Sequence, residues 1–247
     1  MTEPIEEVAT SLRKIQLPAL TRPELGPDDP PTLELVQFDL KAYAYSSIAY
    51  VRDLLNGFLV LVAAQNVAAV DLVVRGIYEW TMQASYVDQQ NRIPLKSGNF
   101  VECRTIMDRV QTGNGWVKRH GDKYWKPPFE DEIPDSLRIK HLVKAYKAHQ
   151  VESRNEENVE DDYGYLSEHA HPNSFCFLDV TRRSGRVLEF VEPAPGHRSR
   201  GIVTATILDW SLCIHNILGL AEERVVRREF VEMLKRVVTR DESGRDM

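Results

Sequence analysis

The chain has 247 residues, of which 43% are hydrophobic and 28% are charged, and its formal net charge is −6. This composition supplies enough apolar side chains for a core and excludes a chain that is disordered throughout. The negative charge balance excludes a uniformly basic nucleic-acid-binding surface, although it permits a local basic patch.

Cysteine usage and hydropathy bear on the compartment. Cys103, Cys176 and Cys213 lie far apart and form no C-x-x-C pair, so they predict no disulfide framework and fit a reducing compartment. The most apolar run, 58–64, is much shorter than the roughly 20 residues that cross a bilayer. The acidic N-terminus carries no signal-peptide core. We therefore expect a cytoplasmic protein without membrane association.

The predicted elements begin with an arm, residues 1–31. Apolar residues at helical spacing predict a short amphipathic helix over 4–17. Five prolines between Pro18 and Pro31 then predict an extended linker. We expect the arm to dock either on the body of the protein or on a partner.

The body, residues 32–240, reads as helical, and 241–247 as a disordered tail. A turn at Gln65-Asn66 predicts an antiparallel pair of long helices. A β-hairpin of strands 175–180 and 186–191 is expected around Ser184-Gly185. The expected helices span 32–63, 67–90, 99–111, 135–151, 155–171, 200–218 and 221–239. The predicted fold class is an all-α bundle of five to six helices with a small β-hairpin insertion. Because the long helices are apolar around much of their circumference, we also expect a homo-oligomer.

Arg75 and Glu79 lie four residues apart in the second long helix and therefore share one helix face. The simplest interpretation is an ordinary ion pair within one helix. The functional alternative is a charged pair poised for chemistry, because ionisable groups among apolar neighbours mark many active sites.

Tyr163, Ser167 and His171 recur at every fourth residue and form one polar stripe. A histidine at a helix end can act as a general acid or base near neutral pH. It can equally cap helix carbonyls and pack inside the protein. His169 and His171 are two residues apart, so on a helix they point to different sides, and we expect neither a metal nor a cofactor.

The segment 113–126 interleaves cations with large aromatic side chains. This mixture is typical of single-stranded RNA binding, because bases stack on aromatics while phosphates meet Lys and Arg. A long loop pinned to the body by its tryptophans would have the same composition. The candidate nucleic-acid-binding residues are Trp116, Lys118, Arg119, Lys123, Tyr124, Trp125 and Lys126. A second basic set comprises Arg182, Arg183, Arg186, Arg198 and Arg200.

These motifs resemble a family of bacterial helical proteins that carry R-x-x-x-E in the second long helix and Y-x-x-L-S-x-x-x-H-P further on. Here the first motif is Arg75 and Glu79, and the second comprises Tyr163, Leu166, Ser167, His171 and Pro172. That family is in turn similar to the HEPN superfamily of nucleotide-binding helical bundles. The resemblance implies a toxin–antitoxin or phage-defence protein that acts on or binds RNA, often as a dimer.

Two hypotheses follow for function. In the first, the chain is a metal-independent endoribonuclease, with His171, Arg75, Glu79, Ser167 and Tyr163 as its catalytic set. The expected partners are then RNA and a protein such as an antitoxin. In the second, the chain is a non-enzymatic dimerisation or sensor module, and the same polar residues form an internal brace.

Overall fold

The computed structural model describes residues 3–26, 29–111, 139–153, 159–169, 181–184, 187–190 and 197–243. Over these ranges the chain is predominantly helical, as predicted, with eight helices and a two-stranded antiparallel hairpin. The helices are α1 (Glu3–Lys14), α2 (Leu33–Ala63), α3 (Val67–Ser97), α4 (Phe100–Gln111), α6 (Ile139–Ser153), α7 (Val159–His169), α9 (His197–Leu220) and α10 (Val225–Ser243), and the strands are β1 (Thr181–Ser184) and β2 (Val187–Phe190).

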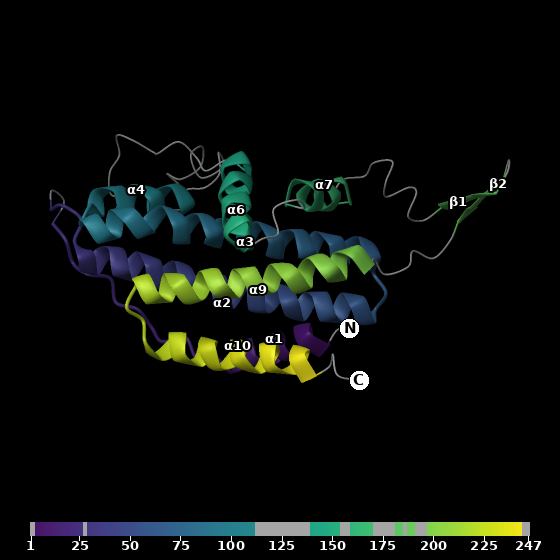
Figure 1. Ribbon diagram of the computed structural model, residues 1–247, viewed down its shortest axis with the longest axis horizontal. Coiled ribbons are helices and arrows are strands. Elements are labelled where there is room, and N and C mark those ends of the chain that lie inside the picture. The colour runs from purple at the N-terminus through teal and green to yellow at the C-terminus, as the bar shows by residue number, and fades with distance from the viewer. Residues whose placement is uncertain are drawn as a thin grey trace.

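Helix α3 is the centre of the arrangement (Figure 1). It packs against α2 and α9, and these three helices form the middle of the molecule. Helices α4, α6 and α7 lie against α3 on one side. On the opposite side, α1 and α10 pack against each other, with α1 also touching α2 and α10 touching α9. Elements that lie far apart in the sequence therefore meet on α3.

The predicted hairpin of long helices is confirmed at its caps. The Thr32 hydroxyl accepts a hydrogen bond from the amide of Leu35, and the Asn66 side chain accepts one from the amide of Ala69. Helix α3 continues to Ser97, beyond the expected end at residue 90, despite Pro94 in its last turns. It ends at Gly98, whose φ of 73° is a left-handed conformation that glycine adopts without steric cost.

Several expectations need correction. Five to six helices was too few, because the described residues alone form eight, including α1, which folds back onto the body and contributes Ile5 and Leu12 to the same core as α2. The expected first strand, 175–180, lies outside the described residues; in the described hairpin β1 pairs with β2 from Thr181↔Phe190 to Ser184↔Val187.

The last helix begins at Val225, not at residue 221. Ala221 and Glu222 form a turn in which Glu222 has a φ of 53°. The Glu223 side chain accepts a hydrogen bond from the amide of Val225 and so caps α10 from outside the helix. Helix α10 then runs to Ser243, so residues 241–243, expected in a disordered tail, are helical.

A line of buried polar contacts, here called the α3–α9 polar seam, joins α3 to α9. Ser199 donates to Asp71, Asn216 donates to Asp88 over 3.0 Å, and Ser85 shares a hydrogen bond with Cys213. The Asp71–Ser199 and Asp88–Asn216 pairs are each separated by 128 residues in the sequence. A constant separation means that the two helices run parallel and in one register.

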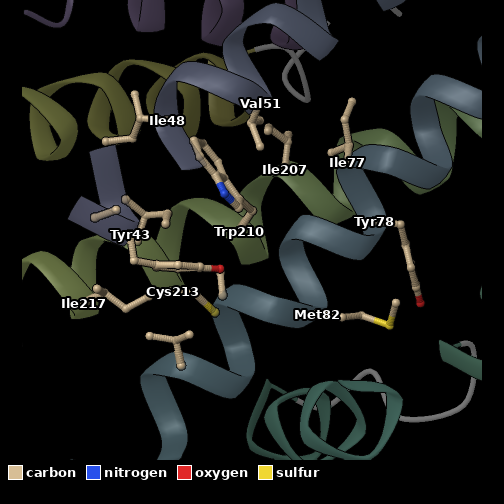
Figure 2. Packing of buried hydrophobic residues seen from close by; sticks show 14 of the residues in the cluster. Tyr43, Ile48, Val51, Ile77, Tyr78, Met82, Ile207, Trp210, Cys213 and Ile217 are labelled. Atoms are coloured by element: carbon tan, nitrogen blue, oxygen red, sulfur yellow. The ribbon is translucent and has the colours of Figure 1, made fainter. Parts of the chain in front are cut away.

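Buried apolar side chains of α2, α3 and α9 pack together around Trp210 (Figure 2). Trp210 of α9 is fully buried, stacks edge-on against Phe230 of α10, and donates its indole N–H to Ser47 of α2 over 2.9 Å. Because a buried indole N–H needs an acceptor, this bond fixes α9 on α2 while its ring contributes apolar contact area.

A buried ionic cluster joins α2 to α4. Arg104 lies 2.6 Å from Asp39 and 2.8 Å from Asp108, and it is almost completely buried. Burial raises the pKa of both carboxyl groups above the ordinary value, and the charge of Arg104 only partly offsets that rise. Arg22 of the proline-rich linker adds a second positive charge beside both acids.

The Arg227 side chain of α10 lies against Gly219, near the end of α9. A Cβ added at Gly219 would lie 3.0 Å from the guanidinium carbon of Arg227, so that side chain would have to shift. That guanidinium lies 3.1 Å from Nε2 of His215. Burial, and then the charge of Arg227, lower the pKa of His215 below its ordinary value of 6.5.

Two helices are long and apolar enough to cross a membrane by length and composition, α2 and residues Arg198–Leu220 of α9. The core helices of soluble proteins pass the same test, so this finding establishes neither a membrane nor a cytoplasmic location.

Arg104→Met should destabilise the protein by about 3–5 kcal/mol, because it leaves the buried Asp39 and the half-buried Asp108 without the cation that bonds to both. The control is Lys235→Met, which removes an exposed ion pair with Glu232 and should cost less than about 1 kcal/mol. Urea unfolding of the three proteins measures both effects. Equal losses in the two variants would contradict the structural role of the Arg104 cluster.

The pKa of His215 is lower in the folded protein than its ordinary value of 6.5. The folded state therefore favours the neutral imidazole, and the stability that this side chain contributes above pH 6.5 is lost as the pH falls from 6.5 through the folded-state pKa. In His215→Gln that contribution is absent. The difference in unfolding free energy between wild type and variant should therefore shrink between about pH 8 and about pH 5. A difference that stays constant over this range would show that His215 does not titrate differently on folding.

Candidate functional site at the α3–α7 contact

The docking of α7 on α3 brings the two sequence motifs together. Tyr78 of α3 is buried and donates its hydroxyl to the carbonyl of Val159, the first residue of α7, over 3.1 Å. Its ring packs edge-on against Tyr146 of α6 with centroids 5.5 Å apart, and it lies 6.5 Å from the ring of Tyr163. Tyr78 was not among the predicted site residues, although it positions α7.

Arg75 is held at this contact from two sides. Its Nε donates to Oε1 of Glu79 over 2.9 Å, and its Nη2 donates to the hydroxyl of Tyr163 over 3.4 Å. The guanidinium carbon lies 5.7 Å from the centre of the Tyr163 ring. Arg75, Glu79 and Tyr163, predicted from two separate motifs, are therefore in one cluster.

This cluster is partly open to solvent. The side chains of Arg75 and Glu79 are 25% and 39% exposed. Burial lowers the pKa of Arg75, but the hydrogen bond and charge of Glu79, aided by Tyr163, raise it overall. Two of the five N–H donors of the guanidinium are engaged by these bonds. The other donors form no hydrogen bond with the residues that the structure describes.

A second arginine–tyrosine pair flanks α7 on its α9 side. The guanidinium of Arg198 lies 4.6 Å from the ring centre of Tyr165, and its Nη2 donates to Asp162 over 3.2 Å. Burial raises the pKa of Asp162 and Arg198 offsets part of that rise. Arg198 belongs to the second basic set predicted from the sequence, whereas Asp162 and Tyr165 were not predicted. Arg198 lies 36 residues from Asp162 along the chain, so no local spacing indicates the contact.

The other predicted site residues are placed only in part. Ser167 of α7 has a buried hydroxyl oxygen with no hydrogen-bond partner within the described part of the chain. His171 and all seven predicted RNA-binding residues of the 116–126 segment lie outside the described residues. Among the residues that the structure describes, no group of three His, Cys, Asp or Glu side chains is arranged to hold a metal ion. The two described cysteines, Cys103 and Cys213, are buried.

Comparisons of this chain with protein-family models, with curated proteins and with solved structures find no match. The resemblance to HEPN proteins therefore stays a prediction, and the contacts of the α3–α7 cluster carry the functional argument.

The two tyrosine hydroxyls at this contact should differ in their contribution to stability. Tyr78→Phe removes a buried donor and leaves the carbonyl of Val159 without it, so we expect a loss of about 1–2 kcal/mol. Tyr163→Phe removes a long bond at a half-buried position and should cost less than about 0.5 kcal/mol. Chemical unfolding of both variants compares them directly, and the reverse ranking would mean that Tyr78 does not anchor α7.

Proposed function

We propose that this chain binds RNA across the α3–α7 surface, as a HEPN-like protein of a bacterial toxin–antitoxin or phage-defence system. One observation supports this most directly: the Arg75 guanidinium is fixed by Glu79 and Tyr163 while a quarter of the side chain stays exposed. A guanidinium held in place loses little side-chain entropy when it binds, and its fork matches the oxygens of a phosphate.

The second arginine–tyrosine pair supports the same ligand class. Arg198 and Tyr165 lie on the other flank of α7, so the helix carries a guanidinium and an aromatic ring on both sides. RNA-binding surfaces combine aromatic rings that stack on bases with arginines that contact phosphates. In this proposal the 116–126 segment, with Lys118, Arg119, Lys123 and Lys126, supplies further phosphate contacts.

Metal-independent cleavage of the bound RNA is the catalytic form of the proposal. His171 would either take the proton of a ribose 2′-hydroxyl or give a proton to the leaving 5′-oxygen of the next nucleotide. The 2′-oxygen attacks the adjacent phosphorus to form a 2′,3′-cyclic phosphate as the bond to the 5′-oxygen breaks, and water exchanges the other proton. Arg75 would stabilise the charge that develops on the phosphorane oxygens. Glu79 orients Arg75, and Tyr163 and Ser167 would position His171 one turn beyond Ser167.

The second candidate is a non-enzymatic helical module in which the α3–α7 cluster is a brace. It is favoured by the contacts that Arg75 already makes with Glu79 and Tyr163, and by the Tyr78–Val159 bond beside them. If the cluster is a brace, losing these contacts should lower the stability of the protein. If it is an RNA site, losing the exposed donors of Arg75 should lower the affinity for RNA and leave stability nearly unchanged. The two functions therefore differ in what Arg75→Gln changes.

Arg75→Gln should weaken binding of labelled single-stranded RNA on the order of tenfold, because it removes a charge-assisted phosphate contact. Arg52→Gln is the matched control. Arg52 has a similarly exposed side chain, 30%, and also pairs with an acid, Asp53, but it lies on α2. Filter binding at several salt concentrations, with thermal melts in parallel, separates affinity from stability. RNA binding that Arg75→Gln leaves unchanged would contradict the proposed surface.

Two further variants divide binding from cleavage. Changing Lys118, Arg119, Lys123 and Lys126 together to glutamine should weaken binding and flatten its salt dependence, since fewer counterions are then released. His171→Ala should abolish cleavage and leave binding intact. A wild-type protein that neither binds nor cleaves RNA, with His171→Ala sharply less stable than wild type, would favour the brace.

A further inference from the structure

The first turn of α7 is acidic, and two of its acids reach cations on other helices. Glu160 lies 3.0 Å from the ammonium group of Lys147 on α6, and Asp162 accepts a hydrogen bond from Nη2 of Arg198 on α9 over 3.2 Å. We call Glu160 and Asp162 the bridging acids. Asp161 lies between them in the sequence, is exposed, and forms no ion pair with the residues that the structure describes.

The bridging acids contribute little to holding α7 in place. Glu160 and Lys147 are 68% and 41% exposed, and ion pairs between exposed side chains add little to stability because water screens them. Helix α7 is anchored instead by Val159 and Leu166, which are buried, and by the hydrogen bond from Tyr78 to the carbonyl of Val159. The ion pairs therefore affect the cations more than they affect the fold.

Both cations lose attraction for phosphate while the bridging acids hold them. A carboxylate in direct contact cancels much of the field of a guanidinium or ammonium group, and it occupies a donor that a phosphate oxygen would use. Arg198 is 49% exposed and lies beside the Tyr165 ring, so it stays within reach of a ligand. A phosphate group that binds Arg198 must therefore compete with Asp162 for its charge.

Arg75 is held differently from these two cations. Its acid, Glu79, lies one turn away on the same helix, so that ion pair does not depend on the position of α7. The bridging acids lie on a different helix from their cations, and their ion pairs exist only while α7 is docked as observed. The α3–α7 surface therefore has one arginine whose ion pair is independent of α7, and two cations whose availability depends on it.

We propose that the bridging acids compete with phosphate groups for Lys147 and Arg198, and so keep the α3–α7 surface in a state of low affinity. RNA then binds by displacing the two carboxylates. This inference rests on the proposed RNA-binding function and names the residues that limit its affinity. Asp161 distinguishes it from a general effect of charge, because all three acids favour the helix dipole but only the bridging acids contact cations.

Binding of labelled single-stranded RNA to the full chain tests the proposal. Asp162→Asn should strengthen binding on the order of tenfold and steepen the slope of log affinity against log salt by about 0.7, because one more phosphate contact forms. Glu160→Gln should act in the same direction but more weakly, since its ion pair is more exposed. The matched control, Asp161→Asn, removes the same charge from the same turn and should change affinity less than about twofold.

Arg198→Gln identifies the contact that Asp162 blocks. Introduced together with Asp162→Asn, it should remove the gain in affinity, whereas in the wild-type background it should change affinity much less. A purely structural role of Asp162 predicts no such coupling between the two positions. Thermal melts of all variants show whether each change of affinity occurs in a protein of unchanged stability.

Inorganic tripolyphosphate separates this inference from the RNA proposal, because it carries phosphate groups without bases. It should raise the melting temperature of Asp162→Asn more than that of Asp161→Asn, since only the former frees a cation. That result, together with no RNA binding by any variant, would reject the RNA proposal and retain the competition with phosphate.

Two results would overturn the inference. Equal gains of affinity in Asp162→Asn and Asp161→Asn would show that net charge alone sets the binding. Affinity for RNA and for tripolyphosphate that neither Asp162→Asn nor Glu160→Gln increases, including no binding at all, would show that the bridging acids do not compete with phosphate. If wild type binds RNA in that case and Arg75→Gln weakens the binding, the RNA surface stands without this inference.

Discussion

The α3–α9 polar seam is the constraint on which the rest of the structure depends. Asp71 and Asp88 are buried on α3, and each accepts a hydrogen bond from α9 only if that helix lies in one register. A slip of one helical turn would break both of these interhelical bonds, a cost that purely apolar contacts between helices do not impose. Because α3 also carries α2, α4, α6 and α7, fixing it against α9 fixes the frame for every other helix.

The candidate site depends on the packing of α3 against α9, because each of these helices carries one of its two arginines. Arg75 lies one turn from Asp71 on α3, and Arg198 precedes Ser199 on α9, so the two guanidinium groups flank the first contact of the seam. Helix α7 then lies between them, with Tyr163 against one and Tyr165 against the other. The rigid part of the molecule therefore sets the spacing of its exposed cations, which is the condition for recognising a ligand of fixed shape.

Local features of the structure could be predicted from the sequence, and features set by distant contacts could not. The capping side chains of Thr32, Asn66 and Asn99 accept hydrogen bonds from amides three residues further on, so residue type and spacing are enough to indicate such caps. Arg75 and Glu79 share a helix face for the same reason. The start of α10 was misplaced because Glu222 and Glu223 suit a first helical turn by charge, yet Glu223 acts as a cap just outside the helix. The Tyr78–Val159 and Arg198–Asp162 contacts arise only when helices pack, and they were missed.

The pairing of α1 with α10 has a consequence for how the chain reaches this structure. Ile5 and Leu12 of α1 are fully buried, and a surface hollow beside them is lined from both helices, by Lys14 and Ile15 on one side and Arg228 and Met233 on the other. Helix α1 precedes α10 along the chain, so it cannot complete its contacts until α10 has been synthesised. Until then the apolar side chains of α1 stay exposed next to the proline-rich linker, where chaperones can bind them or other chains can associate with them. Long-range closure of this kind slows folding, and it makes the native state sensitive to any truncation that removes α10.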